Sequence, residues 1–166
     1  MSPTGPRPLA PDSATYRTVL GHFATGVVLV TALDGEDPVG MACNSFTSVS
    51  LDPPLVLFCA AKSSSTWPRI QAAGRWAANF LDDDGEEICR LFAQKGADRF
   101  ARIAYTPGRS GSPIIEDALA FVDCETFTEH DAGDHIIVVG RVLELGYQAE
   151  GKPLLFYRGG YGRFES

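Results

Sequence analysis

A dense set of small and hydroxyl-bearing side chains occupies residues 40–66, which read GMACNSFTSVSLDPPLVLFCAAKSSST. The first half is rich in short residues, namely Ala42, Cys43, Asn44, Ser45, Thr47, Ser48 and Ser50. The second half ends in one cation and four hydroxyls, Lys62 to Thr66, ahead of Trp67-Pro68, where a helix could begin. Short side chains let a ligand approach the backbone, whereas hydroxyls, a lysine and free helix N–H groups suit a phosphate. The stretch is therefore a candidate site for a flat polar ring followed by an anionic tail.

The same residues also have a plainer interpretation. Residues 44–50 would then be an edge strand with its polar side chains facing water, and the serines would only form a loop. Polar strand ends are common, so the bare pattern favours this second interpretation. Deciding between the two needs information from outside the pattern.

Three segments carry a resemblance to a known family. The string NSFTSVSLDPPLV at 44–56 resembles the signature of the short-chain flavin reductases, the reductase components of two-component flavin-dependent monooxygenases. Gly133-Asp134-His135 and the tail PLLFYRGGYGRF at 153–164 also resemble segments of that family. The resemblance runs from about Tyr16 to Phe164, and the first string is its specific part.

The resemblance implies a set of flavin-binding residues. Around the ring and ribityl chain it places Asn44, Ser45, Phe46, Thr47 and Ser48, whose backbone N–H groups would stabilise negative charge on reduced flavin. Near the phosphate it places Lys62, Ser63, Ser64, Ser65, Asp98, Arg99 and Phe100. An aromatic of the tail, Tyr161, would flank the cofactor, although a terminal strand that completes the core explains the tail equally well.

The implied activity is hydride transfer from NADH, or NADPH, to FMN or FAD, with release of the reduced flavin to a partner monooxygenase. The resemblance also implies a homodimer, because a shallow groove gains walls from a second subunit. Two other functions on the same barrel stay open: a non-enzymatic flavin-binding carrier or sensor, and an oxidase like those that act on pyridoxamine phosphate.

His135 is the candidate catalytic residue. In the family a histidine of the Gly-Asp-His turn lies near the nicotinamide, and His135 matches that position. The alternative is a surface turn histidine paired with Asp134 or another acid.

The standard nucleotide-binding motifs are absent. Residues 21–26 have the glycine spacing of a phosphate loop, but Val27-Val28 follows where that loop needs a lysine and a hydroxyl. Gly160-Tyr161-Gly162 stands at the end of the sequence without a following helix, so no Rossmann unit is indicated. A nicotinamide would have to bind in some other way.

The hydrophobic spacing predicts mostly strands. Helices are expected from Asp12 or Ser13 up to Gly26, over 67–73, and after the acidic run Asp82 to Asp84, which is predicted to cap a helix rather than to bind a metal. Strands are expected over 27–33, 38–41, 55–61, 75–81, 118–129 and 135–146, and the last two should pair as a hairpin through a tight connection at 131–134. Residues 95–113 are predicted to be a long loop. Strands joined by turns, with few helices between them, imply an antiparallel barrel or sandwich. The resemblance narrows this fold class to a mainly β protein with an antiparallel split β-barrel of the Greek-key type and a few flanking helices.

Length and composition agree with one domain. A chain of 166 residues with 45% hydrophobic content predicts a single domain, at 12–166, after a flexible arm at 1–11. The resemblance implies that this domain is a flavin reductase-like split barrel. The net charge of -7 argues against a nucleic-acid partner. No apolar run is long enough to span a bilayer and no signal peptide is recognisable, so we expect a cytoplasmic protein. The four cysteines form no C-x-x-C pair, and we expect no metal site.

Overall fold

The computed structural model describes residues 5–94 and 98–165, and it is mainly β with few helices. The helices are α1 (Ser13–Leu20), α2 (Trp67–Ala73), α3 (Glu86–Ala93) and the 3-10 turn η1 (Phe100–Arg102). The strands are β1 (Thr25–Gly26), β2 (Val28–Asp34), β3 (Asp37–Cys43), β4 (Thr47–Leu51), β5 (Pro54–Ala61), β6 (Arg75–Phe80), β7 (Tyr105–Pro107), β8 (Pro113–Ile115), β9 (Ala120–Ala132), β10 (His135–Tyr147), β11 (Leu154–Tyr157) and β12 (Gly160–Arg163).

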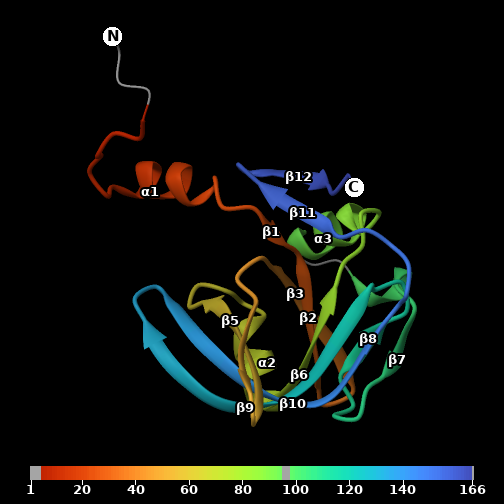
Figure 1. Ribbon diagram of the computed structural model, residues 1–166. Coiled ribbons are helices and arrows are strands. Elements are labelled where there is room, and N and C mark those ends of the chain that lie inside the picture. Colours follow the sequence, from red (N-terminus) through yellow and green to blue (C-terminus); the bar gives the residue numbers. More distant parts are fainter. Residues whose placement is uncertain (1–4, 95–97, 166) are drawn as a thin grey trace.

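A seven-stranded antiparallel sheet forms the body of the molecule, in the order β3-β2-β6-β9-β10-β5-β4. It is strongly curved (Figure 1), and the long hairpin of β9 and β10 forms its middle, between β6 and β5. Two smaller sheets accompany it, β1-β11-β12 and β7-β8. The end strands β3 and β4 are not paired with each other, so the large sheet is not closed.

Strand β2, next to the end strand β3, is largely buried on both faces, because both faces of the sheet are covered there. Val28 and Val30 belong to one buried cluster, which includes Trp67 and Ile70 of α2. Leu29 points the other way, into a second cluster with Cys89 and Phe92 of α3. The two helices therefore cover opposite faces of the same sheet, and the apolar side chains from Val28 to Val30 alternate between the two clusters.

Close packing in the first cluster centres on Trp76. Its side chain is fully buried, its indole N–H donates to Thr126 Oγ1 over 3.2 Å, and its ring lies edge-on to Phe58 at 4.8 Å between centroids. A Cβ at Gly140 would lie only 2.4 Å from Cζ2 of Trp76. The glycine in β10 therefore makes room for the largest side chain of the core.

Several element predictions are confirmed. Helix α2 has the predicted bounds, and Gly74 ends it with a φ of 65° that favours glycine. The hairpin of β9 and β10 turns at Gly133-Asp134, and Gly133 has a φ of 68° at the first central position, as a type II′ turn requires.

Three local predictions were wrong. Helix α1 begins at Ser13 with Asp12 as its cap, but it ends at Leu20, with Gly21 as its C-cap, because residues 25–26 pair with β11 instead of extending the helix. The run of three aspartates does not cap α3: Gly85 is its N-cap, and Asp82 bridges to Pro153.

The predicted loop at 95–113 was wrong in its described part, which contains η1 and β7, whereas residues 95–97 lie outside the described residues. The pairing of β7 with β8 explains the regular backbone at Tyr105. Among the residues that the structure describes, no helix has the length and apolarity needed to traverse a lipid bilayer.

Candidate functional site

A polar cavity of about 470 Å³ lies between β3, the start of α2 and η1. We call it the β3–α2 cavity. Its lining residues are Pro38, Val39, Gly40, Ser65, Thr66, Arg69, Asp98, Arg99 and Phe100. It thus joins four of the residues that the resemblance assigned to the phosphate: Ser65, Asp98, Arg99 and Phe100. These residues come from segments more than 30 positions apart, so the fold alone brings them together.

Gly40 shapes the floor of this cavity. A Cβ at Gly40 would lie 2.8 Å from Cε1 of Phe92 and 3.4 Å from Cζ of Phe100. The absence of a side chain lets both aromatic rings pack onto β3, and the rings themselves meet edge-on at 5.2 Å. Phe100 is thereby held against the strand, next to the cavity.

Arg99 is fixed in place by neutral acceptors. Its Nη2 donates to the carbonyl oxygen of Gln94 over 2.6 Å, its Nη1 donates to that of Gly40 over 3.4 Å, and its guanidinium lies 5.7 Å from the ring centre of Phe92. Carbonyl oxygens position the guanidinium without cancelling its charge. Arg99 is therefore a preorganised cation facing the cavity.

Arg69 is a second cation that sequence analysis missed. It lies in α2, three residues after Thr66, and its Nε donates to Asp34 Oδ2 over 2.6 Å. Its Nη2 lies 3.9 Å from Asp37 Oδ2, so part of its charge is offset. The available signal was its position on the first turn of the predicted helix after the serine run, which directs it to the same side as Thr66.

The three serines at 63–65 have different roles in the structure. Ser64 Oγ accepts hydrogen bonds from the backbone N–H groups of Thr66 (3.2 Å) and Trp67 (3.1 Å), so Ser64 holds the start of α2. Ser65 lines the β3–α2 cavity, whereas Ser63 is exposed and does not line it. Lys62 does not line it either, because its ammonium pairs with Asp131 at the β9–β10 hairpin.

A smaller recess of about 170 Å³ lies further along β3. It is lined by Val27, Ala42, Cys43, Asn44, Phe156 and Tyr161. Gly40 and Ala42 are two positions apart on the same strand, so the recess follows the β3–α2 cavity along the edge strand of the sheet. Burial raises the pKa of the Cys43 thiol to about 11, so this thiol is protonated at neutral pH.

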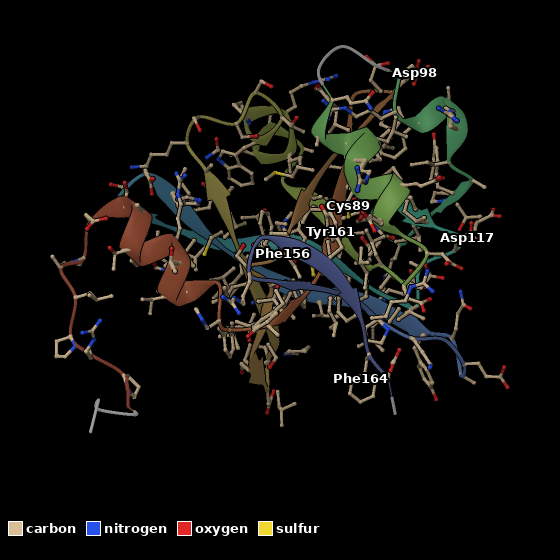
Figure 2. The ribbon with its side chains drawn as sticks, turned by 90° about the horizontal axis from the view of Figure 1, so that it is seen from above. Cys89, Asp98, Asp117, Phe156, Tyr161 and Phe164 are labelled. Carbon is tan, nitrogen blue, oxygen red and sulfur yellow. The ribbon has the colours of Figure 1, made fainter. Side chains whose placement is uncertain are left out.

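Tyr161 forms part of the wall of the recess. Its ring meets Phe156 edge-on at 5.5 Å, and Figure 2 shows Tyr161, on the β11–β12 hairpin with Phe156, close to Cys89 of α3. Burial, followed by the neighbouring Cys89, raises the pKa of the Tyr161 hydroxyl. Asp98 lies beyond the far end of α3 in the same view, at the β3–α2 cavity.

The remaining residues of the motif at 44–48 face elsewhere. Ser45 Oγ accepts from the N–H of Cys59 over 2.9 Å and donates to the carbonyl of Cys59 over 3.2 Å, so its hydroxyl joins the motif to β5. Phe46, Thr47 and Ser48 line a third, mainly apolar cavity of about 500 Å³ between β4, β6 and the segment after β10. The five motif residues are therefore adjacent in sequence but do not share one site. One lines the recess, one is bonded to the backbone of β5, and three line the apolar cavity.

His135 lies at the tip of the β9–β10 hairpin, where it is paired in register with Ala61 of β5. Its Nδ1 lies 2.7 Å from Asp134 Oδ1, and the hydrogen bond and charge of His135 lower the pKa of Asp134. The backbone carbonyl of Asp134 also accepts from the N–H of Lys62 over 2.9 Å. The hairpin tip is thus attached to the start of the serine run, although His135 lines none of the three hollows described above.

Comparisons with known proteins agree on one family. The model of the flavin reductase like domain matches residues 20–165. The chain is 48% identical over 154 residues to a flavin reductase of Pseudomonas putida, covering 92% of this chain and 91% of the relative. It is 45% identical over 156 residues to the reductase subunit HsaB of a flavin-dependent monooxygenase of Mycobacterium tuberculosis, covering 93% and 83%.

A solved structure is similar over nearly the whole chain. The NADH:FAD oxidoreductase SgcE6 of Streptomyces globisporus, in complex with NAD and FAD fragments, superposes with a TM-score of 0.90 at 36% identity, covering 96% of this chain and 98% of that one. Both this match and that of the family model extend far beyond the motif at 44–56. The chain therefore belongs to the flavin reductase like domain family.

Proposed function

We propose that this protein is an NAD(P)H-dependent flavin reductase, which transfers a hydride from NADH to FMN or FAD and supplies the reduced flavin to a partner monooxygenase. The observation that carries the proposal is a pair of hollows along β3, an end strand of the large sheet. The cationic β3–α2 cavity includes Gly40, and the Asn44–Tyr161 recess includes Ala42, two positions further along the strand. A flavin nucleotide has the matching polarity, with a phosphate at one end and a flat polar ring at the other.

The phosphate end is assigned to Arg99, Arg69 and Ser65. Arg99 presents a charge that carbonyl oxygens position but do not neutralise, and Ser65 adds a hydroxyl donor. Each charge-assisted hydrogen bond to a phosphate contributes roughly 1.5–3 kcal/mol. Asp98 fits a different role, because its Oδ1 accepts from the N–H of Ala101 over 3.3 Å and so stabilises η1.

Phe46, Thr47 and Ser48 line the separate cavity beside β4, so the ring end is assigned to Asn44, Ser45 and Tyr161. Their backbone and the small side chain of Ala42 allow a flat ring to approach the edge of β3, and Ser45 holds the motif against β5. Bound flavin supplies an electron-accepting N5 for the hydride. The protein supplies proximity and orientation, so no side chain needs to act as an acid or base in the hydride step.

His135 is proposed to position the nicotinamide. Asp134 accepts the hydrogen bond of Nδ1, which leaves Nε2 free to contact a ligand at the hairpin tip. Lys62 lies beside the same tip through its bond to Asp134 and its pairing with Asp131. This arrangement makes Lys62 part of the hairpin rather than of the phosphate site.

The proposal includes the architecture. We infer a single domain at 12–166 with a split β-barrel of the Greek-key type, supported by the strong curvature of the seven-stranded sheet (Figure 1). A homodimer is supported by exposed apolar side chains on β4, where Leu51 is 97% and Val49 48% exposed. A cytoplasmic location remains a prediction of the sequence.

Anaerobic stopped-flow mixing of protein, flavin and NADH, followed at the flavin absorbance, tests the function. We expect NADH oxidation by the purified protein to depend on added free flavin, because an open recess at a strand edge releases its ligand. A control without flavin should show no turnover. Tightly bound flavin that NADH does not reduce would instead support a carrier or sensor.

A further inference from the structure

A second hollow opens from the β3–α2 cavity on the side away from the Asn44–Tyr161 recess. It has a volume of about 500 Å³ and is lined by Asp37, Pro38, Arg69, Asp98, Phe100, Ala101 and Tyr105. Four of these residues, Pro38, Arg69, Asp98 and Phe100, also line the β3–α2 cavity. The two hollows are therefore compartments of one groove, and we call the outer one the Tyr105 compartment. Its volume is in the range of sites that hold a nucleoside-sized group, about 300–1,000 Å³.

Tyr105 gives this compartment a rigid aromatic wall. Its backbone is paired with Ile115 in the β7–β8 ladder. Its ring meets Phe100 edge-on at 5.5 Å, and Phe100 in turn meets Phe92. The side chain is nevertheless 37% exposed, so part of the ring faces the hollow. A half-exposed aromatic ring whose position is fixed by its neighbours can stack a nucleobase.

The groove changes from cationic to anionic side chains from its inner to its outer compartment. Arg69 lies where the two compartments meet, and Arg99 lies in the inner one. The carboxylates of Asp37 and Asp98 line the outer compartment, where they are acceptors for sugar hydroxyls or for an exocyclic amine. They would repel a further phosphate there. The groove therefore suits a diphosphate near the arginines followed by an uncharged nucleoside.

We propose that the Tyr105 compartment binds the adenosine half of FAD, with the adenine on the Tyr105 ring and the second phosphate at Arg69. FAD is then the preferred flavin of this enzyme, and FMN fills only the inner compartment. This inference rests on the proposed flavin reductase function. It assigns the compartment to FAD rather than to the adenosine of NADH, because the compartment continues directly from the flavin-phosphate site at Arg99.

Kinetics with paired flavins test the assignment. Replacement of Tyr105 by alanine should raise the KM and Kd for FAD about tenfold, the scale of one lost base-stacking contact. The KM for FMN and for riboflavin should not change, and neither should the KM for NADH measured with FMN as acceptor. Tyr105→Phe should retain the FAD affinity, because it retains the stacking surface. Tyr16→Ala removes another exposed tyrosine, far along the chain in α1, and should behave like the wild type.

A competition measurement on the wild type does not depend on the variant folding. ADP should raise the KM for FAD far more than the KM for riboflavin, since only FAD competes for the adenosine compartment. Equal losses for FAD and FMN in Tyr105→Ala, an increased KM for NADH with FMN, or a wild type that binds FMN as tightly as FAD would each overturn the assignment. The absence of turnover with any flavin would instead refute the reductase function itself.

Discussion

The two ends of the stretch 40–66 contain similar hydroxyl residues but use them differently. Near its start, the Ser45 hydroxyl is hydrogen-bonded to both the N–H and the carbonyl of Cys59. Near its end, the Ser64 hydroxyl accepts hydrogen bonds from the N–H groups of Thr66 and Trp67 at the start of α2. Its neighbour Ser65 instead lines a cavity that also contains two arginines. A hydroxyl that is already bonded to the backbone stabilises the fold, and one that faces a cavity is available to a ligand.

This difference allows the stability of the fold and the affinity for phosphate to be changed by separate mutations. The variants that break the Ser45 and Ser64 bonds should lower stability and leave the intrinsic affinity for phosphate intact. The variant at Ser65 should do the reverse. The predictions for Ser65, Ser45 and His135 run from the largest expected effect to the smallest, and Ser64→Ala is given beside Ser65→Ala as its matched control.

Ser65→Ala should weaken FMN binding by about 1.5–3 kcal/mol and should leave riboflavin binding unchanged, because only FMN has the phosphate that the hydroxyl would contact. Titration of each flavin, followed by fluorescence quenching, measures both affinities.

Ser64→Ala is the matched control for Ser65→Ala. It should lower the free energy of unfolding by about 1 kcal/mol through the loss of the helix cap, with little change in the ratio of the FMN and riboflavin affinities. Equal losses of FMN and riboflavin affinity in Ser65→Ala would remove Ser65 from the phosphate site.

Ser45→Ala should lower the free energy of unfolding by about 1–3 kcal/mol, because the N–H and carbonyl of Cys59 lose their half-buried partner. Urea denaturation measures the change. Ser63→Ala is the control, since Ser63 is exposed, and it should be neutral. If Ser45→Ala kept the stability of the wild type but lost flavin affinity, the hydroxyl would contact the ligand rather than stabilise the fold through Cys59.

His135→Ala should raise the KM for NADH and slow hydride transfer, with nearly unchanged flavin affinity. One positioning hydrogen bond contributes roughly 0.5–1.5 kcal/mol, so we expect at most about a tenfold loss of kcat/KM. Stopped-flow traces at several NADH concentrations separate binding from hydride transfer.

His130→Ala provides the control for His135→Ala, because His130 is also a histidine of the same hairpin and is exposed. A loss of about 10²–10⁴-fold in His135→Ala would indicate an obligatory proton donor, and unchanged NADH kinetics would make His135 only a turn residue.

Much of the fold was predictable from local patterns. The bounds of α2, the β9–β10 hairpin and the apolar strands follow from periodicity and from glycine at positive φ, which depend on residues close in sequence. The three aspartates at 82–84 misled the prediction, because the bridge from Asp82 to Pro153 is a contact between residues 71 positions apart. Local preference gives no information about such a partner.

The sequence by itself determined the family, the mainly β class and the set of residues from which the site is drawn. Only the tertiary structure decided their tasks: it placed Ser65 and not Ser64 in the cavity, paired Lys62 with Asp131, and added Arg69 beside Arg99. The physical reason is that a hydroxyl or a charge has a few hydrogen-bonding positions, and the fold determines which of them its own backbone and carboxylates occupy. What remains unoccupied is left for the ligand.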